Sequence, residues 1–194
     1  MKLRESGMPA EELWETLFDV PLVLERFQIG PVVADAVELG CGYGTFSVPI
    51  AKRISGTLRT FDIDAAMVER TRERASLLGV RGLLCELRDV FETGFPVPAG
   101  SQDAVFLFNI LHGEDPVRLL KESARVLRGA GAIYVIHWRH DPATPRGPPL
   151  NIRPKPEDCV RWAEEAGLLL GAGGIVDLPP WHYGLTLIGA RRPS

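Results

Sequence analysis

The sequence predicts an α/β fold built around a mainly parallel sheet, and two observations support this. From Val33 to about residue 138, strand-like apolar runs alternate with helix-like segments, which is typical of successive βα units. The first run leads into a glycine-rich turn, as in parallel sheets that bind nucleotides. The candidate strands are Ala36 to Leu39, Leu58 to Phe61, Gly82 to Leu87, Ala104 to Phe108 and Ile133 to Ile136.

The glycine-rich turn V-E-L-G-C-G-Y-G-T ends the first candidate strand. Gly40, Gly42 and Gly44 carry no Cβ and adopt positive φ readily, so a ligand can approach the main chain closely. The amides that follow Gly44 open the next helix, where unpaired N–H groups favour an anionic or electron-rich group. The dinucleotide fingerprint G-x-G-x-x-G requires glycine at position 45, which is Thr here. The turn therefore predicts a cofactor site outside the standard dinucleotide pattern.

Acidic residues accompany this turn at three strand ends. Glu38 lies two residues before the first glycine, and Asp62 and Asp89 close the second and third candidate strands. The position of Asp62 suits hydrogen bonds from both ribose hydroxyls, and that of Asp89 suits an adenine amino group. Glycines alone are common in ordinary turns, but together with these carboxylates they indicate a nucleoside cofactor. Asp64 is predicted to cap the next helix instead of binding ribose.

These residues resemble the class I S-adenosylmethionine-dependent methyltransferase family over most of the chain. VELGCGYG matches the family's E/D-x-G-x-G-x-G motif, FDID its ribose-binding strand end, and RDVF its adenine-contacting loop. DAVFLFNILH and VLRGAGAIYVIHW match the fourth and fifth strand motifs. Gly129-Ala130-Gly131 stands where the family usually has a P-G-G turn.

The resemblance implies a Rossmann-like, doubly wound, seven-stranded, mainly parallel sheet with one antiparallel strand near the edge and helices on both faces. It implies S-adenosyl-L-methionine as methyl donor and S-adenosyl-L-homocysteine as product. The reaction would be in-line transfer to an oxygen, nitrogen or carbon nucleophile of a small molecule. The residues expected to bind the cofactor are Glu38, Gly40, Cys41, Gly42, Gly44, Asp62, Ile63, Asp89, Val90 and Asn109.

Two histidines follow the fourth and fifth strands and are the candidate general bases. An imidazole near its ordinary pKa can take a substrate proton at neutral pH, so His112 is the first candidate and His137 the second. The alternative, that His112 packs or caps at the strand end, stays open. The H-x-x-H spacing from His137 to His140 lacks further ligands nearby, so we expect no metal site. The motif N/D-P-P-Y/F is missing, which argues against methylation of adenine or glutamine nitrogen.

Length and composition predict one domain, residues 1–194. With 194 residues, of which 45% are hydrophobic, the chain can form one substantial core. Residues 1–32 are expected to form a helical cap or lid, and residues 33–140 the cofactor-binding core. Residues 141–194 are expected to supply a substrate-side loop and the closing strands. The loop is expected because residues 141–156 contain six prolines, too many for a continuous helix or central strand.

Helix boundaries follow from capping residues. A helix is predicted after Asp64 with a stop at Gly79, and another from Pro116, capped by Asp115, with a stop at Gly129. A last helix begins at Pro156 and ends at Gly167. Two closing strands are expected, and the candidate segments that would supply them are Leu168 to Leu170, Gly174 to Leu178 and Leu185 to Ile188.

The acceptor side offers only weak signals. Arg139, Arg146 and Arg153 in the proline-rich region could recognise an anionic acceptor, although loop arginines are most often solvated. His137 and the adjacent Trp138 are placed to line an acceptor pocket. Trp181, His182 and Tyr183 make a similar case from the far edge of the sheet.

Charge and cysteine content limit the partners. A net charge of −3 and a pI near 5.8 give no broad attraction to phosphate backbones, so we expect a small-molecule acceptor and no obligate nucleic acid. Three cysteines without C-x-x-C spacing suggest neither a disulfide framework nor zinc. No apolar run reaches membrane-spanning length. We expect a cytoplasmic monomer or homodimer with no membrane partner.

Two alternatives come from other functional classes. A nicotinamide-dependent oxidoreductase also binds ribose through an acidic residue after the second strand, but Thr45 argues against it. A non-catalytic module that binds S-adenosylmethionine for regulation would keep the cofactor residues and lack transfer. The polar residues Asn109 and His112 near the reactive position favour an enzyme.

Overall fold

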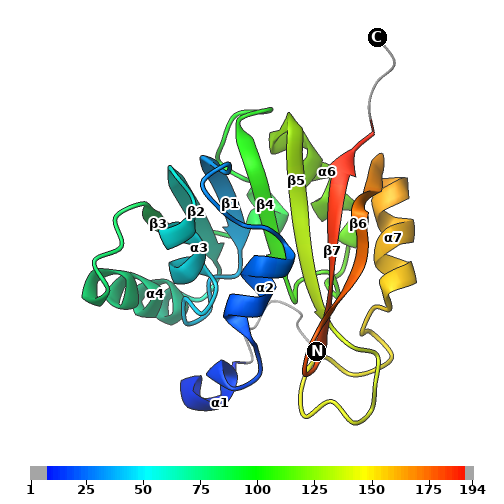
Figure 1. The fold of residues 1–194 in the computed structure, drawn as a ribbon, viewed down its shortest axis with the longest axis horizontal. Coiled ribbons are helices and arrows are strands. Elements are labelled where there is room, and N and C mark those ends of the chain that lie inside the picture. Colours follow the sequence, from blue (N-terminus) through cyan, green and yellow to red (C-terminus); the bar gives the residue numbers. More distant parts are fainter. Residues whose placement is uncertain (1–7, 191–194) are drawn as a thin grey trace.

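The computed structural model describes residues 8–190, which form a seven-stranded sheet with helices on both faces (Figure 1). The strand order is β3-β2-β1-β4-β5-β7-β6, and β7 runs antiparallel to both of its neighbours while the other pairings are parallel. The predicted fold class is thereby confirmed. The strands are β1 (Asp35–Leu39), β2 (Thr57–Asp62), β3 (Leu83–Leu87), β4 (Gln102–Phe108), β5 (Leu127–Trp138), β6 (Leu168–Leu178) and β7 (His182–Gly189).

The helices begin where the sequence places their caps. Asp64 Oδ1 accepts a hydrogen bond of 2.8 Å from the amide of Ala66, and Asp115 Oδ1 accepts one of 2.9 Å from that of Arg118. The expectation that Asp64 caps a helix is therefore confirmed. The helices are α1 (Glu11–Glu15), α2 (Val20–Arg26), α3 (Ser47–Arg53), α4 (Ala65–Leu77), α5 (Val90–Thr93), α6 (Pro116–Val126) and α7 (Pro156–Glu165).

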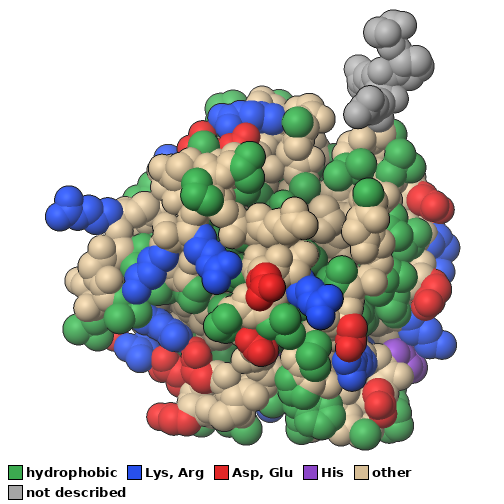
Figure 2. Space-filling view, viewed as in Figure 1, with side chains coloured by type: hydrophobic (Ala, Val, Ile, Leu, Met, Phe, Trp, Pro, Cys, Tyr) green, Lys and Arg blue, Asp and Glu red, His purple; other side chains and the backbone are tan. Residues whose placement is uncertain are grey.

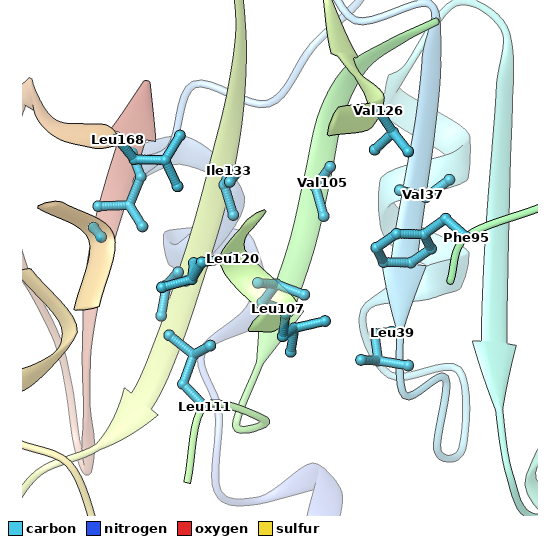
Figure 3. Packing of buried hydrophobic residues seen from close by; sticks show 14 of the residues in the cluster. Val37, Leu39, Phe95, Val105, Leu107, Leu111, Leu120, Val126, Ile133 and Leu168 are labelled. Atoms are coloured by element: carbon cyan, nitrogen blue, oxygen red, sulfur yellow. The ribbon is translucent and has the colours of Figure 1, made fainter. Parts of the chain in front are cut away.

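The sheet separates two hydrophobic cores, since both faces of a mainly parallel sheet must be covered. On one face α2 and α3 pack through residues such as Leu24 and Ile50, and they lie in front of the sheet in Figure 1. On the other face α6 and α7 pack through Leu120 and Cys159. Figure 3 shows part of this second core, in which side chains of β1, β4 and β5 point toward the side chains of α6. The two cores hold the central strands rigidly, which fixes the positions of their carboxyl ends.

The predicted stop of α6 at Gly129 is wrong. The helix ends at Val126 and β5 begins at Leu127, which pairs with Gln102 of β4. The next pair is Ala104 with Ala132, so the intervening β5 residues, including Gly129 and Gly131, form a bulge inside the strand. A Cβ at Gly131 would lie 2.9 Å from Leu127 Cδ2 and 3.0 Å from the Asp103 carbonyl. Gly131 therefore permits close strand packing, and neither glycine terminates the helix.

The closing strands differ from the prediction in one detail. Leu168 to Leu170 and Gly174 to Leu178 belong to one strand, β6, whose pairing with β7 shifts between Leu170 and Ile175. The proline-rich residues 141–155 contain turns and bends only, as predicted. Acidic and basic side chains are interspersed over the lower half of the face drawn in Figure 2. No helix among residues 8–190 has the length and apolar character needed to cross a membrane.

Candidate functional site

A cavity of about 390 Å³ lies at the carboxyl ends of β1, β2, β4 and β5. In open α/β sheets this edge is where ligands bind. α1 and the loop after β5 lie at the same end of the sheet (Figure 1). The expected cofactor and base residues found in its lining are Glu38, Gly40, Cys41, Gly42, Asp62, Ile63, Asp89, Val90, Asn109 and His112.

Two expected residues, Gly44 and His137, do not line the cavity. Gly44 has a φ of +75°, and a Cβ there would lie 3.2 Å from Thr71 Oγ1. Its role in the structure is to let the turn pack against α4. His137 is buried behind His112.

The glycine turn has the backbone that its sequence predicts. Gly40 and Gly42 adopt φ values of +85° and +49°, which residues other than glycine rarely adopt. A Cβ at Gly40 would lie 3.1 Å from Ile110 Cδ1, and one at Gly42 would lie 3.1 Å from Met8 Cε. Both glycines border the cavity, so the main chain itself forms that part of its wall.

Asp62 ties the glycine turn to the tip of β2. Its Oδ2 accepts a hydrogen bond of 3.1 Å from the Gly42 amide, and its Oδ1 accepts one of 3.0 Å from the Asp64 amide. The side chain is buried, and burial raises the pKa of this carboxyl, while the two amide hydrogen bonds act in the opposite direction. Asp62 thus orders the turn and still presents carboxylate lone pairs to the cavity.

Glu38 is a nearly fully buried carboxyl in the same cavity wall. The Ser47 hydroxyl donates a hydrogen bond of 2.5 Å to Glu38 Oε2. Burial raises the pKa of Glu38 to about 7, and the Ser47 hydrogen bond only partly offsets this. A buried acid that titrates near neutrality is suited to a cationic ligand group, which would favour its carboxylate form.

The pKa of Glu38 predicts how stability depends on pH. A group whose pKa is higher in the folded than in the unfolded state contributes stability below its unfolded value, and loses it as pH rises through its folded value. Relative to Glu38→Gln, we expect the free energy of unfolding to fall by up to about 3 kcal/mol between about pH 4.5 and pH 7. Urea unfolding of both cofactor-free proteins on either side of that window tests this. Parallel pH profiles for the two proteins would contradict it.

Asn109 follows β4 with a φ of +59°, a conformation uncommon outside glycine. Its amide donates a hydrogen bond of 2.8 Å to the Ile136 carbonyl. Asn109 lines the cavity, and its Oδ1 is buried without a hydrogen-bond partner within the described residues 8–190. A buried acceptor without a partner is costly, so this atom fits a ligand that donates a hydrogen bond. Together with the carboxyls of Glu38 and Asp62, it fits a nucleoside that carries an ammonium group.

His112 and His137 form a buried pair beside the cavity. His112 Nδ1 lies 3.2 Å from His137 Nε2. Burial lowers the pKa of His112 below its usual 6.5, and the complete burial of His137 lowers its pKa well below that value. Both rings are therefore neutral at pH 7. His112 lines the cavity, and Nε2 is the ring nitrogen that does not contact His137. His140 is exposed, and its Nε2 lies 2.9 Å from the Leu150 carbonyl, so it does not join this pair.

The structure adds aromatic residues to the site that the sequence did not bring together. Trp14 and Trp138 line the cavity with their ring centroids 6.4 Å apart, and Phe46 and Phe108 line it at 4.8 Å from each other. The loop segment 146–149 also lines the cavity. No motif links these residues, because they come from separate parts of the chain and meet only in the fold.

Four other residues that the sequence suggested for acceptor binding make their contacts outside the cavity. Arg139 forms an ion pair with Asp177, and Arg153 is buried inside its own loop. His182 stacks on Phe18 at a centroid distance of 4.4 Å, and burial lowers its pKa to about 3. The Tyr183 hydroxyl donates a hydrogen bond of 2.9 Å to the Pro154 carbonyl. None of these four side chains contributes to the cavity lining.

Comparison with known proteins places this site in a family. Residues 36–131, which contain the glycine turn and all three acidic strand ends, match a family described as "Methyltransferase domain". The chain belongs to the class I S-adenosylmethionine-dependent methyltransferases. This confirms the resemblance drawn from the motifs, and S-adenosylmethionine is the cofactor of this family.

Curated relatives match this methyltransferase over part of their length. It is 31% identical over 107 residues to aklanonic acid methyltransferase DauC of Streptomyces sp. (strain C5), covering 53% of this chain and 48% of the relative. It is 30% identical over 116 residues to a probable S-adenosylmethionine-dependent methyltransferase of Mycobacterium tuberculosis, covering 59% of this chain and 39% of the relative. The chain thus spans less than half the length of these relatives.

Solved structures share the fold of this methyltransferase. An S-adenosylmethionine-dependent methyltransferase from Aquifex aeolicus superimposes with a TM-score of 0.79 at 22% identity, covering 91% of this chain and 92% of the other. NcsB1, an O-methyltransferase from neocarzinostatin biosynthesis, gives a TM-score of 0.74 at 16% identity, covering 92% and 56%. The NcsB1 structure contains S-adenosylmethionine and 2-hydroxy-5-methyl naphthoic acid.

Proposed function

We propose that this methyltransferase acts on a hydroxyl oxygen of a small aromatic molecule. The observation that carries the proposal is one cavity in which the acidic strand ends, His112 and the rings of Trp14 and Trp138 converge. Acidic groups and glycine main chain suit the cofactor, and flat apolar rings suit a planar acceptor. NcsB1 supports this class of acceptor, since it is an O-methyltransferase solved with a hydroxylated naphthoic acid. DauC, named for aklanonic acid, supports a small-molecule acceptor.

The cofactor side of the cavity would be formed by Glu38, Gly40, Gly42, Asp62 and Asp89. Asp62 would accept hydrogen bonds from ribose, Glu38 and Asn109 Oδ1 would face the ammonium group, and Asp89 the adenine amino group. When bound, S-adenosylmethionine supplies a methyl group already activated by a sulfonium. The protein then has to hold the acceptor oxygen in line and exclude water, a proximity effect worth up to about 7–11 kcal/mol.

On the acceptor side, His112 would remove the hydroxyl proton. In the tautomer in which the Nδ1–H of His112 donates to His137 Nε2, the Nε2 of neutral His112 is unprotonated and would receive the proton. His137 cannot readily take a second proton because it is fully buried, so it would orient His112 without competing for the proton. An ammonium acceptor would need the same base, because it must also lose a proton before it can attack.

Two experiments test the proposal. Calorimetry with S-adenosylhomocysteine and with NAD distinguishes the methyltransferase from an oxidoreductase, and NAD binding without S-adenosylhomocysteine binding would overturn it. Formation of S-adenosylhomocysteine is then measured with 1,4-dihydroxy-2-naphthoic acid, a ligand of one NcsB1 structure. The matched control is the same acid with both hydroxyls already methylated. Tight cofactor binding with no turnover of any phenol would favour the non-catalytic alternative.

We further propose that α1 acts as a lid over the cofactor. The sequence predicts a cap or lid over residues 1–32, of which 1–7 lie outside the described residues, and α2 packs in the core through Val23 and Leu24. No residue of α1 is buried, and apart from the ring contacts of Trp14 with Phe18 and Trp138 the helix is attached through polar contacts. Glu11 pairs with Arg70 at 2.8 Å, and Glu15 pairs with Arg74 at 2.5 Å and accepts a hydrogen bond of 2.7 Å from Thr45. Contacts of this kind are weak and screened by salt, so they permit opening.

Glu15→Gln tests the lid. We expect S-adenosylhomocysteine affinity to fall roughly threefold and hydrogen exchange in residues 8–18 to accelerate, because the variant loses its charge against Arg74. The affinity of the wild type should fall with added salt more steeply than that of the variant. Glu12→Gln, an exposed position on the same helix, is the control. Equal salt dependence in all three proteins contradicts the lid.

A further inference from the structure

Arg153 is a buried guanidinium inside the loop that joins β5 to α7. Only 8% of the residue is exposed. Its Nε and Nη2 donate hydrogen bonds of 3.0 Å and 2.8 Å to the Pro148 carbonyl. The remaining bonds gather acceptors from the rest of the loop, namely the carbonyls of Arg139 (3.1 Å), Asp141 (3.2 Å) and Arg146 (3.3 Å) and the hydroxyl of Thr144. One side chain thus holds both ends of the loop together.

The chemistry of these contacts requires arginine. Every acceptor bonded to Arg153 is a neutral carbonyl or hydroxyl, and burial lowers the pKa of the guanidinium, but an arginine in a protein remains protonated. Its planar fork offers five N–H groups in different directions, whereas lysine offers three from a single atom. A lysine at position 153 would keep the charge and lose most of these contacts.

The loop that Arg153 holds together also lines the cavity, through residues 146–149. Gly147 has a φ of +115°, and a Cβ there would lie 2.8 Å from Trp138 Cγ and 3.0 Å from Arg153 Nη2. The loop backbone at Gly147 therefore packs directly against both the Trp138 ring and the guanidinium. Residues 146–149, of which Arg153 binds the carbonyls of Arg146 and Pro148, line the same cavity as Trp14 and His112.

We propose that Arg153 is a positioning residue that sets acceptor specificity by fixing the 146–149 wall against Trp138. This inference rests on the proposed function, because it assumes that this half of the cavity receives the acceptor. The cofactor half is built from the tips of β1 and β2 and shares no hydrogen bond with Arg153. Loosening the clamp should weaken acceptor binding and leave cofactor binding intact.

The test compares Arg153→Lys and Arg153→Met with the wild type. The control is Arg161→Lys, an exposed arginine of α7 paired with Asp158. Three readouts are used: calorimetric affinity for S-adenosylhomocysteine, hydrogen exchange of residues 140–152 in that complex, and binding of 1,4-dihydroxy-2-naphthoic acid to it by quenching of tryptophan fluorescence. In Arg153→Met we expect exchange in the loop and the dissociation constant of the acid to rise at least roughly tenfold. Cofactor affinity should stay within about threefold, and Arg153→Lys should fall between the wild type and Arg153→Met.

Gly147→Ala provides a second route to the same wall with Arg153 intact. The added methyl forces the loop away from Trp138, so it should weaken binding of the acid without weakening S-adenosylhomocysteine. Unchanged loop exchange in Arg153→Met, or equal losses of cofactor and acid affinity, would overturn the positioning role. A wild type that binds S-adenosylhomocysteine but not the acid would instead refute the aromatic acceptor, while the loop exchange would still decide whether Arg153 clamps the wall.

Discussion

Asp62→Ala is expected to weaken S-adenosylhomocysteine binding by at least roughly 100-fold, or about 3 kcal/mol. The substitution removes a carboxylate proposed to bind ribose and leaves the Gly42 amide without its acceptor, each of which costs about 1–3 kcal/mol. The turn between Gly40 and Gly44 then loses one of its hydrogen bonds to β2 and keeps the hydrogen bond of 2.7 Å from the Gly40 amide to the Phe61 carbonyl. Isothermal calorimetry measures the affinity, and Asp62→Asn, which keeps one acceptor oxygen, should show an intermediate loss.

Asp64→Ala is the matched control, because it lies two residues away in the same F-D-I-D segment. It removes the α4 cap, so we expect a stability loss of about 1 kcal/mol and an unchanged affinity for S-adenosylhomocysteine. An Asp62 variant that stays folded and binds the ligand as tightly as the wild type would contradict the ribose assignment. Equal affinity losses in both variants would point to a general disturbance of this segment.

Much of the fold was predictable because the deciding signals are local. Asp64 and Asp115 mark helix starts through hydrogen bonds to amides two or three residues away, and such contacts need no knowledge of the rest of the chain. The prediction that α6 stops at Gly129 was wrong because the deciding signal is not local. Whether Gly129 and Gly131 end a helix or form a bulge depends on pairing between Leu127 and the distant Gln102, which no local pattern encodes.

The candidate site also contains residues that local sequence signals predict and residues that only the fold brings together. Glu38, Asp62 and Asp89 were predictable because each follows a parallel strand, and the carboxyl ends of such strands meet at one edge. Trp14 reaches the cavity from an N-terminal helix and meets Trp138 only through the packing of that helix on the sheet. Arg146 and Arg153 have similar sequence surroundings, yet one borders the cavity and the other is buried in the loop. Their difference arises from the path of the loop backbone, which the prolines restrict but do not specify.

His112→Ala is expected to lower the turnover number with a phenolic acceptor by roughly 10²–10⁴-fold, while affinity for S-adenosylhomocysteine stays close to that of the wild type. The variant removes the one imidazole nitrogen proposed to accept the hydroxyl proton. His137 cannot substitute, because its complete burial disfavours the imidazolium form. Because burial lowers the pKa of His112, the wild-type rate should decline only below about pH 6.5, and this acidic limb should vanish in the variant.

Two further histidine variants separate a base from a packing residue. His140→Ala, an exposed histidine in the loop after β5, should keep the wild-type rate and pH profile. His137→Ala should lower the rate less than His112→Ala, since it removes only the contact that orients Nδ1 of His112. If His112→Ala retains the rate and the acidic limb while the cofactor still binds, His112 is a packing residue at the end of β4. The acceptor proton must then leave to water, which would favour an acceptor already ionised at neutral pH, such as an acidic phenol or a carboxylate.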